Sequence, residues 1–134
     1  MNFSKTTSYA ISVLSFLAKH EGDKYSAKRL NEILEIPWPY LRQLLTSLSK
    51  SGFIFSTQGR KGGFQLNKPA EQIVLAEIID SVEGLKVLDT CIMGFKECPF
   101  DHTCAMHEVW DETRNSILKV LNNTTLDQLL KADK

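Results

Sequence analysis

The chain has 134 residues, 43% of them hydrophobic and 24% charged, and its formal net charge is zero. This length supports one domain with a real core but not two independent domains. No apolar run is long enough to span a bilayer, and residues 1–10 lack the apolar core of a secretory signal. These features exclude a membrane protein and lead us to expect a cytoplasmic one.

The charged residues are segregated along the chain. Residues 1–68 hold ten Lys or Arg and four Asp or Glu, a balance of +6, whereas residues 69–134 hold six and twelve, a balance of −6. This segregation favours a first half that binds a polyanion such as DNA and a second half that avoids it. Chance segregation is the alternative explanation.

Two helices are predicted at the start of the chain. The first begins at the N-cap Ser4 and ends near Gly22, and the second begins at the N-cap Ser26 and ends before Pro37. The first has apolar residues at helical spacing: Tyr9, Ala10, Val13, Leu14 and Leu17. The second has a predicted buried stripe: Leu30, Ile33 and Leu34.

A third helix is predicted from Pro39, which suits a first turn, to Gly52, which suits a helix end. Leucines at i, i+3, i+4 and i+7 predict its buried stripe: Leu41, Leu44, Leu45 and Leu48. Two β-prone runs, residues 53–58 and 64–67, flank the sequence GRKGG and predict a hairpin. A helix pair joined by a tight turn and followed by a hairpin is the plan of a winged helix-turn-helix.

The outward face of this third helix is the predicted reader of DNA. The second helix of a helix-turn-helix enters the major groove, so its solvent face must carry donors and acceptors for base edges. Arg42 can read guanine and Gln43 can read adenine, each through two hydrogen bonds. Tyr40, Thr46 and Ser47 are predicted to contact phosphates or thymine methyl groups. The alternative is an ordinary solvated helix face.

The predicted hairpin has a basic, glycine-rich tip. Arg60 and Lys61 lie among three glycines, which would let the backbone approach DNA closely. The two cations are expected to contact phosphates or the minor groove. A flexible, solvated hairpin is the alternative.

The second half is predicted to contain a helix over residues 69–82, an irregular segment over 84–103, and a long helix over 104–121. Thr125 and Gln128 predict a capping box before a short last helix. The long helix has a broad apolar stripe: Met106, Val109, Trp110, Thr113, Ile117, Val120 and Leu121. Because the stripe is wider than one small domain can cover, we expect this helix to pair with its copy. Packing of Trp110 and Ile117 inside their own subunit is the alternative.

All three cysteines lie in the irregular segment or at its end. Four donors occur within seventeen residues: Cys91, Cys98, Cys104 and His107. Three thiolates and one imidazole suit an iron–sulfur cluster or zinc, and Cys104 and His107 share one face of a helix start. The alternatives are inert buried thiols, a structural zinc site, or a metal-free sensor in which Cys98 and Cys104 oxidise together.

Four parts of the chain carry a family resemblance: KTTSYAISVLSFLA, PYLRQLLTSLSKSGFIFSTQGRKGGFQL, the Cys–Cys–Cys–His segment, and LNNTTLDQLL. Together they resemble the Rrf2 (Rrf-two) family of winged-helix transcription regulators, which includes IscR and NsrR, over nearly the whole chain. The resemblance implies a homodimer that binds palindromic DNA. It also implies a [2Fe–2S] or [4Fe–4S] cluster that tunes DNA binding in response to iron–sulfur status, nitric oxide or redox state.

The resemblance also implies a ligand set. Four residues match the IscR-type ligands: Cys91, Cys98, Cys104 and His107. Six residues separate the first two cysteines, where IscR and NsrR have five. NsrR-like relatives take a carboxylate from near the N-terminus of the partner subunit, and the matching position here is Ser8, a poor ligand. This favours His107 as the fourth ligand, with Asp101 or His102 as lesser candidates.

These observations predict a mainly α fold: a winged helix-turn-helix over residues 1–68, and a sensor loop with dimerisation helices over 69–134, in one compact domain. The expected function is that of a homodimeric repressor. Its affinity for a palindromic double-stranded operator would be set by an iron–sulfur cluster, with [2Fe–2S] favoured over [4Fe–4S]. A thiol-redox or zinc-dependent regulator of the same fold is the alternative. No motif suggests a catalytic pocket, so an enzyme is not expected.

Overall fold

The computed structural model describes residues 4–85, 91, 93, 99–100 and 104–131. The elements in chain order are α1 (Lys5–Lys19), α2 (Ala27–Leu34), α3 (Trp38–Lys50), β1 (Ile54–Thr57), β2 (Gly63–Leu66), the 3-10 helix η1 (Ala70–Gln72), α4 (Leu75–Val82), α5 (Ala105–Asn123) and α6 (Leu126–Lys131). The fold is mainly helical, with β1 and β2 paired as an antiparallel hairpin, which confirms the predicted fold class.

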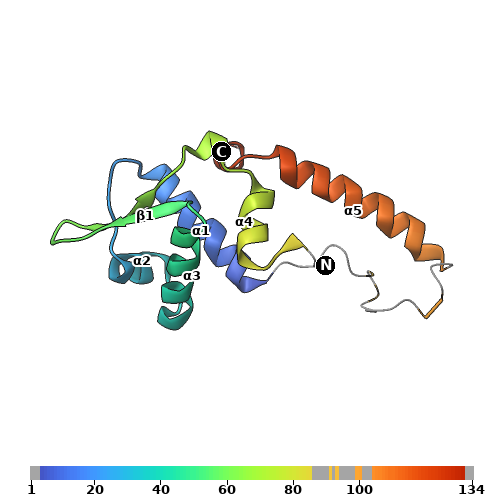
Figure 1. The fold of residues 1–134 in the computed structure, drawn as a ribbon, viewed down its shortest axis with the longest axis horizontal. Helices are drawn as coiled ribbons and strands as arrows, with labels where there is room; N and C mark the ends of the chain where they lie inside the picture. Colours follow the sequence, from blue (N-terminus) through green and yellow to red (C-terminus); the bar gives the residue numbers. More distant parts are fainter. Residues whose placement is uncertain (1–3, 86–90, 92, 94–98, 101–103, 132–134) are drawn as a thin grey trace.

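The hairpin and α5 project at opposite ends of the molecule (Figure 1). Between them α1 crosses the body, with α2 and α3 toward the hairpin and α4 toward α5. The C-terminal end of α5 joins the body beside α6, and its N-terminal end lies far from it. No helix in the described ranges is both long and apolar enough to cross a membrane.

The core forms where the predicted apolar stripes of α1 and α3 meet. Every predicted leucine of α3 is buried, and so are most of the predicted apolar residues of α1: Ala10, Val13, Leu14 and Leu17. The side chain of Ser4 caps α1 by accepting from the backbone N–H of Thr7, as predicted. α1 ends at Lys19, three residues before Gly22, which lies in the following turn with a φ of +91°.

The turn of the helix-turn-helix is shaped by one left-handed residue, Glu35. Ser26 caps α2 as predicted, and α2 ends at Leu34, followed by the C-cap Glu35 at a φ of +55°. The chain then buries Ile36, whereas Ile33 is 43% exposed, so the predicted buried stripe of α2 is wrong at Ile33. An eight-residue helix contacts its neighbours over about two turns, which leaves part of an apolar stripe in solvent.

The end of α3 directs the chain into the hairpin of β1 and β2, which is the wing of the winged helix-turn-helix. Gly52, at a φ of +83°, donates its N–H to the carbonyl of Ser49, and Phe53 donates to the carbonyl of Leu48, both at 3.1 Å. This pair of bonds is a Schellman motif, which satisfies the last carbonyls of the helix and reverses the chain. The hairpin is then held to the body because Tyr25 and Phe64 exchange two backbone hydrogen bonds, of 3.1 and 2.8 Å.

The helix predicted over residues 69–82 is interrupted, so that prediction is wrong in its middle. Ile73 and Val74 are extended between η1 and α4. The carbonyl of Ile73 accepts from the N–H of Leu126 at 2.7 Å, and Val74 forms a β-bridge with Thr125. Pairing with a segment some fifty residues away therefore prevails over the local helical pattern.

The last helix starts as predicted. The N–H of Thr125 donates to the side chain of Gln128 at 2.9 Å, and the N–H of Gln128 donates to the hydroxyl of Thr125 at 3.2 Å, which is a capping box. Leu126 is fully buried and belongs to the core. Asp127 raises the pKa of Lys131 through a hydrogen bond and its charge, four residues away on α6.

A partly buried hydrogen bond joins the two halves of the chain. Thr7 is only 1% exposed, and its hydroxyl donates to the carboxylate of Glu83, the residue that follows α4. The same carboxylate oxygen accepts the backbone N–H of Ser4 at 3.0 Å. Glu83 therefore fixes the start of α1 to the end of α4, eight residues before Cys91, where the cysteine segment (residues 91–107) begins.

Candidate DNA-binding surface and cysteine segment

The solvent face of α3 is defined by the leucine stripe on its other side. Because that stripe is buried, side chains on the opposite side must point away from the body. Arg42, Gln43 and Thr46 are exposed, Tyr40 is 58% exposed, and Ser47 is half-buried. All five predicted readers therefore have access to solvent.

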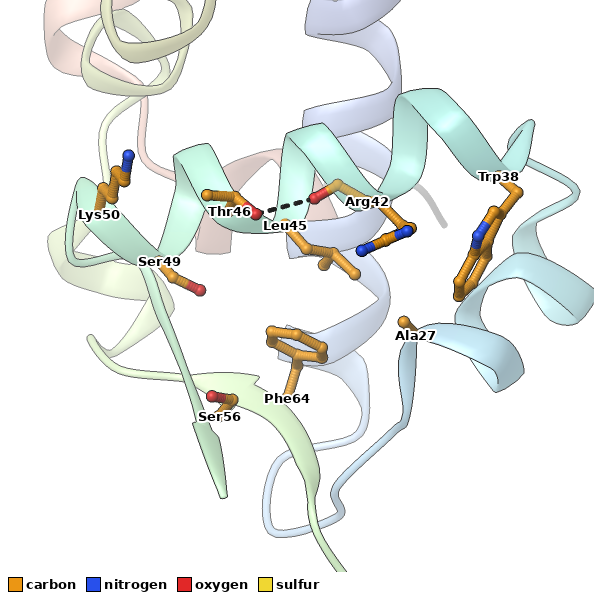
Figure 2. A pocket seen from close by; sticks show the side chains of 9 residues that line it. All are labelled: Ala27, Trp38, Arg42, Leu45, Thr46, Ser49, Lys50, Ser56 and Phe64. Carbon is orange, nitrogen blue, oxygen red and sulfur yellow. Dashed lines mark hydrogen bonds between the residues drawn. The ribbon is translucent and has the colours of Figure 1, made fainter. Parts of the chain in front are cut away.

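A groove lies between one flank of α3 and the strands of the wing (Figure 2). This groove has a volume of about 380 Å³ and lies between the start of α2, α3 and the hairpin. It is lined by Ala27, Trp38, Arg42, Leu45, Thr46, Ser49, Lys50, Ser56 and Phe64. The guanidinium of Arg42 points into it and lies beside the Trp38 ring. The hydroxyl of Thr46 donates to the carbonyl of Arg42 at 3.1 Å, which leaves the Thr46 oxygen free to accept a bond.

Tyr40, Gln43 and Ser47 lie on the other flank of α3. They line a smaller cavity of about 240 Å³ with Thr6 of α1 and Val82 of α4. The Tyr40 ring also lies 6.5 Å from the ring of Tyr9, measured between centroids. Helical spacing predicts that the five residues share one face of α3. In the structure, Arg42 and Thr46 lie on the side of the wing, and the other three lie on the side of α4.

The wing exposes both predicted cations, Arg60 and Lys61. The glycines beside them have a structural reason that the sequence does not reveal. A Cβ at Gly62 would lie 2.0 Å from the carbonyl oxygen of Thr57, and one at Gly63 would lie 2.7 Å from the backbone of Tyr25. These two glycines therefore allow the hairpin to pack closely against Thr57 and Tyr25, a role that is separate from any contact with DNA.

Sequence reasoning missed two residues of the wing-side groove. Trp38, the first residue of α3, is 41% exposed, and Lys50, the last, is exposed as well. Lys50 is the second cation that borders this groove, after Arg42, but its ammonium is turned away from the wing strands (Figure 2). A Trp and a Lys at the ends of a predicted recognition helix are the signals that could have indicated them.

The cysteine segment is described at only some of its positions. Cys91 and Cys104 are half-buried free thiols, whereas Cys98, Asp101 and His102 lie outside the described residues. Within the described positions, no three His, Cys, Asp or Glu side chains gather as a metal site. The structure therefore leaves the predicted ligand set as a prediction.

Three of the predicted donors, Cys91, Cys104 and His107, lie within the described residues. Cys104 is the N-cap of α5 and makes no side-chain capping bond, and the N–H of His107 donates to its carbonyl at 3.2 Å. Cys104 and exposed His107 thus lie one turn apart at the start of α5. The N–H of Met93 donates to the sulfur of Cys91 at 3.4 Å. Ser8 lies exposed on α1.

The comparisons with known proteins agree over the full chain. Residues 3–132 match the model of the Rrf2 family, described as an iron-dependent transcriptional regulator. The regulator NsrR of Oceanobacillus iheyensis is 31% identical over an alignment that covers 100% of this chain and 92% of that protein. CymR, the global cysteine regulator of B. subtilis, matches with a TM-score of 0.80 and 27% identity, over 98% of each chain. IscR of T. potens matches with a TM-score of 0.77 and 28% identity, over 100% of this chain and 89% of that one.

The family match spans the winged helix-turn-helix, the cysteine segment and α5 together. The relatives named above are regulators of transcription and not enzymes, as the sequence predicts. The chain belongs to the Rrf2 family of winged-helix, DNA-binding transcription regulators.

Proposed function

We propose that the chain is a homodimeric repressor that acts in the cytoplasm and reads a palindromic operator with α3 and the wing. The observation that carries this proposal is that Arg42 and Thr46 line one groove with the wing strands, while Arg60 and Lys61 lie exposed at the wing tip. Base-reading and phosphate-binding groups are thus offered by adjacent elements. Residues 1–68 would carry the reader, and residues 69–134 the sensor and the dimer contact.

The division of α3 into two flanks refines the roles of the five predicted readers. Arg42 on the wing side suits direct reading of guanine, because its guanidinium is exposed and not held in an ion pair within the described residues. Gln43 suits adenine, while Tyr40, Thr46 and Ser47 suit phosphates or thymine methyl groups. The wing cations suit phosphates or the minor groove.

The DNA surface is tested by measuring salt-dependent affinity for a duplex selected from a randomised library with the full-length protein. Arg42→Ala should cost about 1–3 kcal/mol and relax the preference at one base pair in each half-site. Arg60→Ala and Lys61→Ala should weaken all duplexes evenly and lower the salt slope by about one each. Lys119→Ala, an exposed cation on α5, is the matched control and should leave the slope unchanged. Normal slopes in both wing variants would contradict the role of the wing.

We also propose that the cysteine segment holds an iron–sulfur cluster, with [2Fe–2S] favoured over [4Fe–4S]. The residues that would hold it are Cys91, Cys98, Cys104 and His107, whose three sulfurs and one imidazole are a suitable donor set. When bound, the cluster supplies redox and nitric-oxide chemistry to the sensor. Glu83 precedes this segment and is hydrogen-bonded to the start of α1, which offers a route from the ligands to the reader.

Anaerobic purification with iron and sulfide analysis tests the cluster. Protein prepared without oxygen should be coloured, and Cys98→Ala or Cys104→Ala should abolish the colour together with the acid-labile sulfide. His107→Ala should make the centre more labile, because an open iron is accessible to oxidants. Colourless protein with stoichiometric zinc would contradict the proposal. An unchanged centre in His107→Ala would assign the fourth ligand to Asp101, His102 or another residue.

A cluster-free thiol sensor is the second candidate. The match to CymR, named a global cysteine regulator, favours it, and so do the half-buried free thiols Cys91 and Cys104. In this case, iron-free protein should lose or gain DNA affinity reversibly on mild oxidation, and Cys98→Ser or Cys104→Ser should remove that response.

A further inference from the structure

Trp38 is an exposed aromatic residue that the fold does not require. It occupies the first position of α3, between Pro37 and Pro39, and 41% of its surface is exposed. The four leucines of the same helix are at most 2% exposed, so the core is complete without it. The two prolines restrict the backbone on both sides of Trp38, which limits the directions that the indole can take.

The indole lies beside the side chain that is proposed to read a base. The guanidinium carbon of Arg42 lies 6.0 Å from the centroid of the Trp38 ring, at the outer range of a cation–π contact. The two residues are one helical turn apart and line the same groove (Figure 2). Ala27 of α2 and Phe64 of β2 continue the groove wall, so Arg42 borders an apolar wall on the side of α2.

We propose that Trp38 is a positioning residue for Arg42: its ring restricts the guanidinium to the groove between α3 and the wing and so sharpens the preference of Arg42 for one base pair. An arginine free in solvent samples many rotamers and loses that freedom when it reads a base through two hydrogen bonds. A fixed wall removes the unproductive directions before DNA arrives. This inference rests on the proposed function, in which Arg42 reads a base.

A double-mutant cycle tests the inference. The probes are the duplex selected by the wild-type protein and its single-base-pair variants, and the measured quantity is the affinity ratio at the base pair that Arg42→Ala relaxes. Trp38→Ala should lower this ratio about tenfold, while affinity for an unrelated duplex and the salt slope stay as in the wild type. In the Arg42→Ala background, Trp38→Ala should cause no further loss of the ratio.

Three further variants separate positioning from folding. Trp38→Phe keeps an aromatic wall and should restore most of the ratio, whereas Trp38→Leu is apolar without an aromatic ring, should lower the ratio as Trp38→Ala does, and replaces it as the test if Trp38→Ala does not fold. Ile33→Ala removes an apolar side chain of similar exposure, 43%, that does not line the groove, and it should leave the ratio unchanged.

The outcomes distinguish this inference from the function on which it rests. A wild-type ratio in Trp38→Ala, or an equal loss with and without Arg42, would overturn the positioning role and leave Arg42 as a reader. If Arg42→Ala itself keeps the full ratio at every base pair, then both the reading by Arg42 and the positioning by Trp38 are wrong.

Discussion

α3 and α5 are both amphipathic, but within the described part of the chain only the apolar face of α3 is covered. In α3, 13 residues long, Leu41, Leu44, Leu45 and Leu48 are all buried. In α5, 19 residues long, Trp110 is the only buried residue, while Val109 and Val120 are 55% and 60% exposed. Because the apolar stripe of α3 is buried within its own subunit, the opposite face of α3 is available to contact DNA. A helix whose stripe is left open indicates a partner, and a second copy is the occupant that the family resemblance implies.

The largest expected effect comes from placing a charge on the open face of α5. Val120→Glu should give a folded monomer, because a carboxylate cannot be desolvated at an apolar helix contact, and the dimer constant should weaken by orders of magnitude. Specific DNA affinity should fall with it, since half-sites need two readers. Analytical ultracentrifugation measures the dimer. Val120 lies far along α5 from Cys104, so the variant leaves the cysteine segment intact.

A change in solvent-facing residues of α5 is the matched control. Lys119→Glu alters the charge at the neighbouring exposed position outside the apolar stripe and should keep the dimer. A stable Val120→Glu dimer would mean that the contact between copies lies elsewhere.

The next largest effect should come from the covered stripe of α3. Leu48 is fully buried, so Leu48→Ala should reduce the free energy of unfolding by about 2–5 kcal/mol through lost burial and a cavity. Urea denaturation at a fixed protein concentration measures it. In the monomeric Val120→Glu background, Val109→Ala should cost less than about 0.5 kcal/mol. Equal losses at Leu48 and Val109 would remove the distinction between the two helices.

The wing offers a smaller and local test. Gly62→Ala should destabilise the hairpin by about 1–3 kcal/mol, because the new Cβ meets the Thr57 carbonyl oxygen. Gly59→Ala is the control: its φ of +106° imposes strain, but the Cβ meets nothing within 4 Å, so the cost should be about 1 kcal/mol. If the two variants unfold at the same urea concentration, close packing at Gly62 does not matter.

The smallest expected effect concerns the link between the halves. Thr7→Val removes the hydroxyl that donates to Glu83 and should cost about 1–2 kcal/mol of unfolding free energy. Thr7→Ser keeps the hydroxyl and should cost less. A Thr7→Val protein as stable as the wild type would show that the bond does not fasten α1 to α4.

The features that the sequence predicts correctly are those that depend on neighbouring residues. The leucine stripe of α3, the caps at Ser4 and Ser26 and the capping box at Thr125 depend on residues within one or two turns, so spacing alone reveals them. The helical pattern is misleading at Ile73 and Val74 because these residues pair with residues 124–126, which are too distant in sequence for a local pattern to reveal.

The features that the sequence could not predict depend on contacts between residues that are distant in the chain. The broad stripe of α5 could not show that Trp110 is covered by its own chain while its neighbour Val109 is not. Similarly, helical spacing placed Arg42 and Gln43 on one face, but only the position of the wing and α4 divides them between two flanks. Cys98 lies outside the described residues, so the ligand set stays a prediction.

The proposed function requires that the cysteine segment controls DNA binding by α3 and the wing. The most direct measurement is the affinity for the selected operator before and after the iron is removed by an anaerobic chelator, with the same protein, salt and duplex. If the cysteine segment controls the DNA-binding surface, the affinity should change by about fivefold to 150-fold, the usual range for coupled sites, and should not change in a Cys104→Ala protein treated in the same way. Equal affinities before and after iron removal, in a protein that carried stoichiometric iron and sulfide, would contradict it.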